Sequence, residues 1–243
     1  MSSINVEKLK KIAGEEYVRD NIADRYVYGS DSSVHEALPH VIVRPQSAEQ
    51  VQKLMRYANK EKIPIIPRGS GSGMCGQVVP VQGGIIMDMK AMNRILEINL
   101  QDGYCRVQPG VIDNDLNKAL QPHGVFYPPT PASANVATIG GEIANNASGG
   151  RSVKYGAARD ALLACKVVMT NGNLLSFGST TRVAASGYPL EKLMVGSEGT
   201  LGVITEVQLR LYGIPEAVSS AVCSFETMEG AVNTVILTIQ SGI

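Results

Sequence analysis

Three glycine-rich segments constrain this chain more than any other feature of its sequence. They read P-R-G-S-G-S-G-M-C-G-Q at 67–77, T-I-G-G-E-I-A-N-N-A-S-G-G-R at 138–151 and G-S-E-G-T-L-G-V-I-T-E at 196–206. Glycine lets a backbone adopt positive φ and approach a ligand closely. Three such segments in one domain predict a long, phosphate-bearing cofactor that the chain contacts along its length.

The first segment matches a fingerprint of dinucleotide-binding folds. Gly71 to Gly76 reads G-x-G-x-x-G behind an apolar stretch, and Glu97 lies near the spacing of a ribose-binding acid. The fingerprint requires a helix to open at its third glycine. Here the chain continues Q-V-V-P-V-Q-G-G instead, with Pro80 and a glycine pair where that helix would be. The context therefore disfavours a Rossmann fold that binds NAD(P).

The alternative for the first segment is a nest of backbone N–H groups that binds a pyrophosphate. Ser70 and Ser72 would add hydroxyl donors, and Arg68 would add charge. In the second segment, Thr138–Asn145 predicts the first turns of a helix whose N-terminal amides face an anion. The third segment precedes a strand. The first segment alone reads better as a tight turn without a ligand, and the third reads equally well as a turn or a binding site. Together the three segments favour a bound cofactor.

The remaining pattern predicts a chain of mixed helices and strands. Helices are expected at 6–13, 48–59, 113–120 and 228–239, and strands at 40–43, 63–66, 85–89, 94–98, 104–108, 162–169, 174–177, 202–212 and 217–225. The stretch 85–108 predicts a meander without crossover helices. Asp102-Gly103 and Asn171-Gly172 predict hairpin turns. Ser47 with Gln50 predicts a capping box at the second helix.

Composition excludes some classes of function. The charges balance at 22 basic and 22 acidic residues, which gives no electrostatic reason to expect nucleic acid or an anionic membrane as partner. The N-terminus lacks an apolar signal region, and no apolar run is long enough for a transmembrane segment. Cys75, Cys105, Cys165 and Cys223 form no C-x-x-C pair, so they predict a reduced, cytoplasmic chain with small buried thiols. Cys75, inside a glycine loop, is the exception.

The three segments together resemble a known family, the flavoproteins of the vanillyl-alcohol oxidase/p-cresol methylhydroxylase (PCMH) type. The resemblance rests on P-R-G-S-G-S-G, on P-A-S-A-N-V-A-T-I-G-G-E-I-A-N-N-A-S-G-G with V-K-Y-G close behind, and on G-S-E-G-T-L-G-V-I-T-E. It covers about residues 15–243. The most similar branch holds FAD-linked 2-hydroxy-acid dehydrogenases, such as D-lactate dehydrogenase and the catalytic subunit of glycolate oxidase.

The resemblance implies an α+β fold and a division of the chain. Residues 1–212 would form a PCMH-type FAD-binding domain of two α+β subdomains, a small one to about residue 90 and a larger one after it, with FAD between them. Residues 213–243 would be the first strand and helix of an incomplete substrate (cap) domain. On this view the chain is either a fragment or a short subunit that a partner completes.

The resemblance also implies which residues bind FAD. The pyrophosphate would contact Pro67, Arg68, Gly69, Ser70, Gly71, Ser72, Gly73, Gly76 and Gln77. The flavin and ribityl chain would contact Pro131, Ala132, Ser133, Thr138, Gly140, Gly141 and Asn145, with Ser148, Gly149, Tyr155 and Gly156 nearby. The adenosine would contact Glu198, Gly199, Gly202 and Ile204.

Some members attach FAD covalently through a histidine in or near the first glycine loop. The three histidines here are His35, His40 and His123, none of them in that loop, so we expect non-covalent FAD. They have no partners at metal-ligand spacing, so we expect no metal site.

The implied activity is FAD-dependent oxidation of a small 2-hydroxy acid, by hydride transfer from the α carbon to flavin N5. The catalytic residues stay unidentified, because in this branch the metal ligands, the carboxylate-binding arginine and the base belong to a later domain. One alternative is a non-catalytic FAD-binding or electron-transfer subunit, and the other is the Rossmann NAD(P) protein. The expected partners are the hydroxy acid and an electron acceptor or completing subunit.

Overall fold

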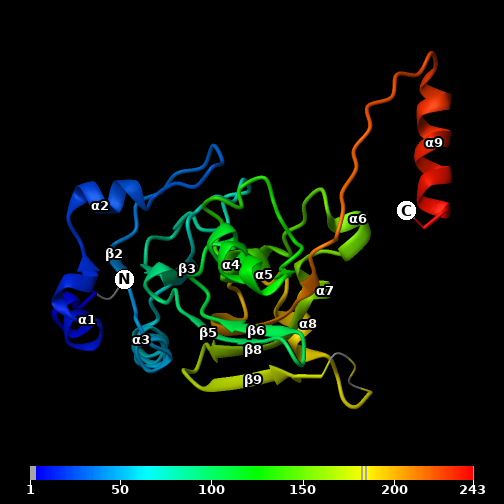
Figure 1. Ribbon diagram of the computed structural model, residues 1–243. Helices are drawn as coiled ribbons and strands as arrows, with labels where there is room; N and C mark the ends of the chain where they lie inside the picture. Colours follow the sequence, from blue (N-terminus) through cyan, green and yellow to red (C-terminus); the bar gives the residue numbers. More distant parts are fainter. Residues whose placement is uncertain (1–3, 182, 184, 243) are drawn as a thin grey trace.

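The computed structural model describes residues 4–181, 183 and 185–242. Its strands form two main sheets with helices packed against them, as the α+β expectation predicted (Figure 1). The helices are α1 (Val6–Ala13), α2 (Ile22–Val27), α3 (Ala48–Glu61), α4 (Asp113–Leu120), α5 (Ile139–Asn145), α6 (Ser152–Tyr155), α7 (Ala158–Ala161), α8 (Leu190–Met194) and α9 (Met228–Gln240). The strands are β1 (Val18–Arg19), β2 (Val41–Val43), β3 (Ile65–Arg68), β4 (Ile85–Asp88), β5 (Ile95–Asn99), β6 (Tyr104–Val107), β7 (Val125–Phe126), β8 (Leu162–Met169), β9 (Leu174–Gly178), β10 (Gly202–Arg210) and β11 (Tyr212–Gly213).

The first sheet has the strand order β1-β2-β4-β3, in which β2, β4 and β3 are parallel. The expected meander is therefore wrong for 85–89, because this strand lies between β2 and β3. All four residues of β4 are buried, which fits the centre of a parallel sheet covered on both faces. Residues 69–84 cross from β3 to β4 without an α-helix. A Rossmann unit requires a crossover helix there, so that hypothesis is wrong.

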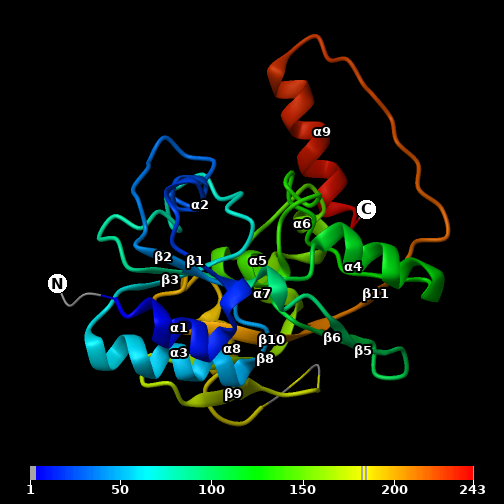
Figure 2. The ribbon, with the colours of Figure 1, turned by 90° about the vertical axis from the view of Figure 1, so that its left-hand side faces the viewer.

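Helices α1 and α3 pack against the first sheet (Figure 2). The side chain of Ser47 caps α3 by accepting a hydrogen bond from the Gln50 N–H, as expected. The Gln50 side chain instead accepts from the N–H of Gln46, 2.8 Å away, one residue before the predicted partner. Val51 and Leu54 are fully buried on the face that meets the sheet. The periodicity of apolar residues thus places this helix correctly.

The second sheet is antiparallel, with the strand order β5-β6-β10-β8-β9. The hairpin turns predicted at Gly103 and Gly172 are confirmed, with φ of +68° and +78°. Helices α4, α5 and α7 pack on one face of this sheet and form a second core with it. The first core also includes Val168 and Val203 from the second sheet, so the two halves of the protein are in contact.

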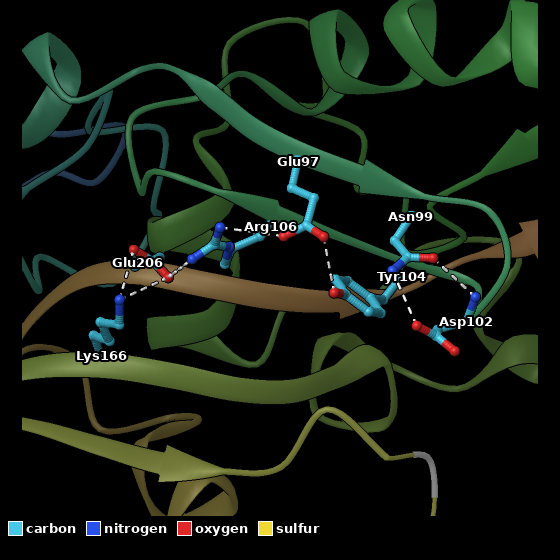
Figure 3. A network of polar contacts seen from close by, with 7 residues as sticks. All are labelled: Glu97, Asn99, Asp102, Tyr104, Arg106, Lys166 and Glu206. Atoms are coloured by element: carbon cyan, nitrogen blue, oxygen red, sulfur yellow. Dashed lines mark hydrogen bonds and ion pairs between the residues drawn. The ribbon is translucent and has the colours of Figure 1, made fainter.

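The other face of the second sheet carries a ladder of charged side chains from β5, β6, β8 and β10 (Figure 3). The Arg106 guanidinium lies 3.2 Å from the Glu97 carboxylate and 3.4 Å from that of Glu206. Glu206 also accepts from Lys166 at 3.1 Å, and the Tyr104 hydroxyl donates to Glu97 at 2.9 Å. Such cross-strand pairs each contribute about 0.2–1 kcal/mol.

The C-terminal part leaves both sheets. Residues 217–225, an expected strand, form none, because no neighbouring strand of the described chain pairs with them. The expected last helix is confirmed as α9, which Thr227 caps. No residue of α9 within the described range is buried, and both views show it at the end of an extended segment, away from the sheets (Figures 1 and 2). None of the described helices combines the length and apolar character that crossing a bilayer requires.

Candidate functional site

The three glycine-rich segments meet at one place between the two sheets. The first follows β3, the second begins α5 and the third leads into β10. Gly69 lies so close to Thr138 that a methyl group at Gly69 would overlap the threonine hydroxyl. A methyl group at Gly199 would lie 3.2 Å from the Pro67 ring. The third segment also donates two backbone hydrogen bonds to the last turn of α5. Segments far apart in the sequence therefore build a single site.

They enclose a cavity of about 1000 Å³, counting the part that opens to solvent. A volume of this order suits a large organic ligand. Most residues expected to bind FAD line the cavity. These are Pro67, Arg68, Gly69, Ser70, Gly71, Ser72, Gly73, Gln77, Pro131, Ser133, Thr138, Gly140, Gly141, Asn145, Glu198, Gly199, Gly202 and Ile204.

Six expected residues lie outside the cavity lining, namely Gly76, Ala132, Ser148, Gly149, Tyr155 and Gly156. Gly76 packs against the ring of His35, and a methyl group added there would lie 3.0 Å from that ring. Gly149 lies against the carbonyl of Thr130. The Tyr155 ring packs edge-on against the rings of Phe126 and Tyr212. Gly76, Gly149 and Tyr155 thus pack against other parts of the protein.

Other lining residues were not predicted, namely Val78, Met89, Pro109, Ala137, Glu142, Ala144, Ala147, Ser197 and Val203. Pro109 had a signal in the sequence, because the Gln-Pro-Gly run marks a tight turn directly after a strand. Met89 and Val203 had none, since each reads as an ordinary core residue. Their place at the cavity depends on how the two sheets pack together.

A segment near the N-terminus also holds the first glycine segment in place. The Asp31 carboxylate accepts a hydrogen bond from the Gly76 N–H at 2.9 Å. The Ser32 N–H donates to the Gly73 carbonyl at 3.0 Å. The sequence Gly-Ser-Asp-Ser-Ser at 29–33 is rich in turn-forming residues but does not indicate which loop it contacts.

The start of α5 differs from the expectation. Thr138 caps the helix, and its hydroxyl accepts from the Gly141 N–H at 3.3 Å. The Gly140 N–H donates to the Pro109 carbonyl at 2.8 Å, and the N–H before it donates to Val111. A helix N-terminus binds an anion through amides that have no other partner. The loop after β6 takes the first two of these amides and Thr138 takes the third, which leaves them no free donor for an anion.

The free amides lie in the first glycine segment instead. Within the described chain, the backbone N–H groups from Ser70 to Cys75 donate no hydrogen bond. The turn at Gly71, where φ is +73°, requires glycine. Consecutive free amides form a concave site for an anion. The first segment is therefore the part of the cavity best suited to phosphate groups.

Arg68, the last residue of β3, lies beneath these amides. Its side chain is only 8% exposed, and its Nη1 atom has no hydrogen-bond partner in the described structure. Burial lowers the pKa of Arg68, while the nearby Tyr28, Asp88 and Asp31 raise it. A buried guanidinium with an unused donor provides the positive charge that an anion at the loop requires.

A buried acidic cluster lies between the first residue of α4 and the middle of α5. Asp113 and Tyr127 are fully buried and Glu142 is 3% exposed, yet Asp113 Oδ2, both Glu142 carboxyl oxygens and the Tyr127 hydroxyl lack a partner. Burial and the adjacent Asp113 raise the pKa of Glu142 to about 10, and burial raises that of Asp113 to about 6. Arg151 and Cys105 also face the cluster. Two ionised carboxylates cannot hydrogen-bond each other, so one proton supplies the missing donor.

Comparisons with known proteins agree with this geometry. Residues 39–178, more than half of the chain, match a family model described as "FAD binding domain". The glycolate oxidase subunit GlcD of Bacillus subtilis is 37% identical over 94% of this chain and 49% of its own length. The mitochondrial D-lactate dehydrogenase [cytochrome] of Arabidopsis thaliana is 39% identical over 98% of this chain and 42% of its own.

Among solved structures, p-cresol methylhydroxylase with bound substrate superimposes with a TM-score of 0.77. The match is 24% identical and covers 87% of this chain and 43% of that one, so it shows the fold alone. The chain spans about half the length of the curated relatives it matches.

Proposed function

The chain belongs to the family of FAD-binding domains, and from this premise we propose that it is the cofactor-binding part of a FAD-dependent oxidoreductase of small 2-hydroxy acids. The substrate class comes from its relatives, which are named as glycolate oxidase and D-lactate dehydrogenases. Another relative, from Stutzerimonas stutzeri, is named D-2-hydroxyglutarate dehydrogenase. All of these names describe acids that carry a hydroxyl group beside the carboxylate.

The observation that carries the proposal is the free-amide loop over a buried guanidinium, in a cavity lined by all three glycine-rich segments. FAD has two phosphates between its flavin and its adenosine, so it requires such a site in the middle of its length. We assign the pyrophosphate to the first glycine segment, the flavin side to the loop at 131–133 and α5, and the adenosine to Glu198 and Gly199. When bound, FAD supplies the two-electron oxidation of the hydroxy acid by taking up a hydride from its α carbon.

The residues of this chain bind and orient the cofactor. The glycines at 69, 71 and 199 leave room for the close approach of neighbouring segments. Among the described residues, no histidine lines the cavity, which supports a non-covalent FAD. After acid precipitation, a non-covalent flavin stays in the supernatant. Flavin that pellets with the protein would contradict this assignment.

The experiment that tests the function is anaerobic reduction of the flavin. The purified chain is loaded with FAD and mixed with D-lactate, L-lactate or glycolate, and the visible flavin absorbance is followed. Bleaching by one of these acids, but not by malonate, supports the proposal. A protein that binds NAD(H) but not FAD would contradict it. The same assay is repeated with a polypeptide that supplies the half of the relatives that this chain does not cover. If no 2-hydroxy acid reduces the bound FAD with or without that polypeptide, the proposed substrate class is contradicted.

A second candidate function is a FAD-binding or electron-transfer unit without its own substrate site. It is favoured by the charged side chains of the cavity, which within the described lining are Arg68, Glu142 and Glu198. Glu142 is buried, and we assign the other two to the cofactor, so none is left as a base for the substrate. Residues 213–243 are then proposed as the start of a substrate domain, since the apolar side chains of α9 are exposed. Reduction of the flavin by this chain alone would contradict the second candidate.

We also propose that the protein is cytoplasmic, since its four cysteines form no closely spaced pair in the sequence. Some relatives are named as mitochondrial, and fractionation of the source cells decides between the two compartments.

A further inference from the structure

Arg68 is a buried cation without an ion-pair partner in the described structure. Asp88 is its direct neighbour on β4 in the register of the sheet. The Asp88 carboxylate is nevertheless engaged by Arg44 at 3.1 Å and by Lys90 at 3.8 Å. Burying a charge without a partner is costly unless a ligand compensates it. The positive charge of Arg68 is therefore available to pair with a bound anionic ligand.

The ring of Tyr28 holds the Arg68 guanidinium in place. The Arg68 Cζ atom lies 5.5 Å from the centre of this ring, a cation–π distance. The ring is itself anchored, because the Tyr28 hydroxyl donates to Asp88 Oδ2 at 2.6 Å. Burial and this hydrogen bond raise the pKa of Tyr28 well above its ordinary value, so the hydroxyl stays a donor. Lys90 Nζ lies 5.5 Å from the same ring, and Asp31 also faces Arg68.

The guanidinium is also in contact with the glycine loop. A methyl group at Gly71 would overlap Arg68 Nη2, so the loop backbone lies directly on the cation. The free amides from Ser70 to Cys75 belong to this same loop. Amides and guanidinium together suit an anion with more than one charge.

We propose that Tyr28 is a positioning residue for the pyrophosphate, because its anchored ring keeps Arg68 beneath the first glycine segment. The inference rests on the proposed function only in naming FAD as the ligand. Tyr28 lies outside the cavity lining and directly after α2, about 40 residues before the loop it serves.

The test separates the phosphates of FAD from its flavin. We compare the dissociation constants of FAD, ADP and riboflavin for the wild-type chain and for Tyr28→Leu, by titration calorimetry. ADP contains the pyrophosphate without the flavin, and riboflavin the flavin without phosphate. Tyr26→Leu is the matched control, since Tyr26 lies on α2 two residues away and is 67% exposed.

We expect Tyr28→Leu to weaken FAD and ADP binding by about tenfold or more and to leave riboflavin unchanged, as loss of one charged contact predicts. Tyr26→Leu should change none of the three. Equal weakening of FAD and riboflavin would mean that Tyr28 supports the fold in general, which overturns the proposal. Unchanged ADP binding in Tyr28→Leu overturns it as well.

Tyr28→Phe keeps the experiment decisive if Tyr28→Leu does not fold. It retains the ring and removes only the anchor to Asp88, so we expect about threefold weaker FAD and ADP binding with riboflavin unchanged. If Tyr28→Phe does not weaken FAD and ADP binding selectively over riboflavin binding, the proposal is overturned. The proposed function fails independently, if wild-type protein binds FAD but no 2-hydroxy acid reduces it.

Discussion

Replacing Glu142 by glutamine tests whether the buried Glu142 and Asp113 side chains share a proton. In the folded protein the pKa of Glu142 is raised to about 10 and that of Asp113 to about 6, from ordinary values of 4.5 and 3.8. Between about pH 6 and pH 10 the folded state therefore binds one proton more than the unfolded state. By linkage, the free energy of unfolding then falls as the pH rises. This contribution to stability is complete below about pH 4, where both states are protonated.

The size of the pH effect on the free energy of unfolding follows from the difference of one bound proton between the folded and unfolded states. One proton corresponds to about 1.4 kcal/mol per pH unit, so wild-type stability falls by about 3 kcal/mol from about pH 6 to pH 8. Glutamine has the size of glutamate, can donate to the Asp113 carboxylate and cannot ionise. Glu142→Gln should therefore lack this slope. Because the wild type loses this stability from the ordinary pKa of 4.5 upward, Glu142→Gln should be more stable than the wild type by about 5 kcal/mol at pH 8 and by about 2 kcal/mol at pH 6.

The assay is urea unfolding followed by far-UV circular dichroism, in steps from about pH 5.5 to pH 8.5. Asp115→Asn is the control, because Asp115 lies on α4 with Asp113, is 65% exposed and pairs with Lys118 at 3.2 Å. It should keep the wild-type slope. Parallel curves for the wild type and Glu142→Gln would refute the shared proton.

Three further substitutions test the site and its supports. Gly69→Ala should lower the free energy of unfolding in urea by about 2 kcal/mol, because its methyl group displaces the Thr138 side chain that caps α5. This cost should be smaller when Thr138 is also replaced by alanine. Gly150→Ala is the control and should cost nothing, because the space around Gly150 is open. If Gly69→Ala costs the same in both backgrounds, the contact is not responsible. Gly172→Ala should cost about 2–3 kcal/mol, seen as a lower thermal midpoint, because φ is +78° and the methyl meets the backbone of α3. Glu198→Gly should leave stability within about 1 kcal/mol, since relief of φ +51° is offset by chain entropy, and should weaken FAD binding about tenfold in a flavin titration. Unchanged FAD affinity would remove Glu198 from the proposed adenosine site.

Most individual elements of the fold could be predicted, because their signals are local. Ser47 caps α3 and the glycines at 103 and 172 form hairpin turns, all within a few residues of the element they end. The strand at 85–88 was found as a strand but given the wrong sheet. Its residues are all apolar or buried, so the pattern contains no polar face that would indicate its neighbours.

The sequence by itself determined that this chain has three glycine-rich segments at the ends of strands and helices, and that they belong to the FAD-binding family. Backbone conformation near a glycine depends on that residue and its neighbours, so it can be predicted from the local sequence. The sequence did not reveal which amides are free. That depends on contacts between distant parts of the chain, as where the Pro109 carbonyl takes the Gly140 N–H.

Only the tertiary structure decided that the free backbone amides lie in the first segment and not at the start of α5. It also placed Tyr28 on Arg68 and Glu142 against Asp113, pairs that are about 30 to 40 residues apart. The physical reason is that a buried polar group must find a partner somewhere in the fold. The packing of the two sheets determines which partner that is, and which donors remain for a ligand.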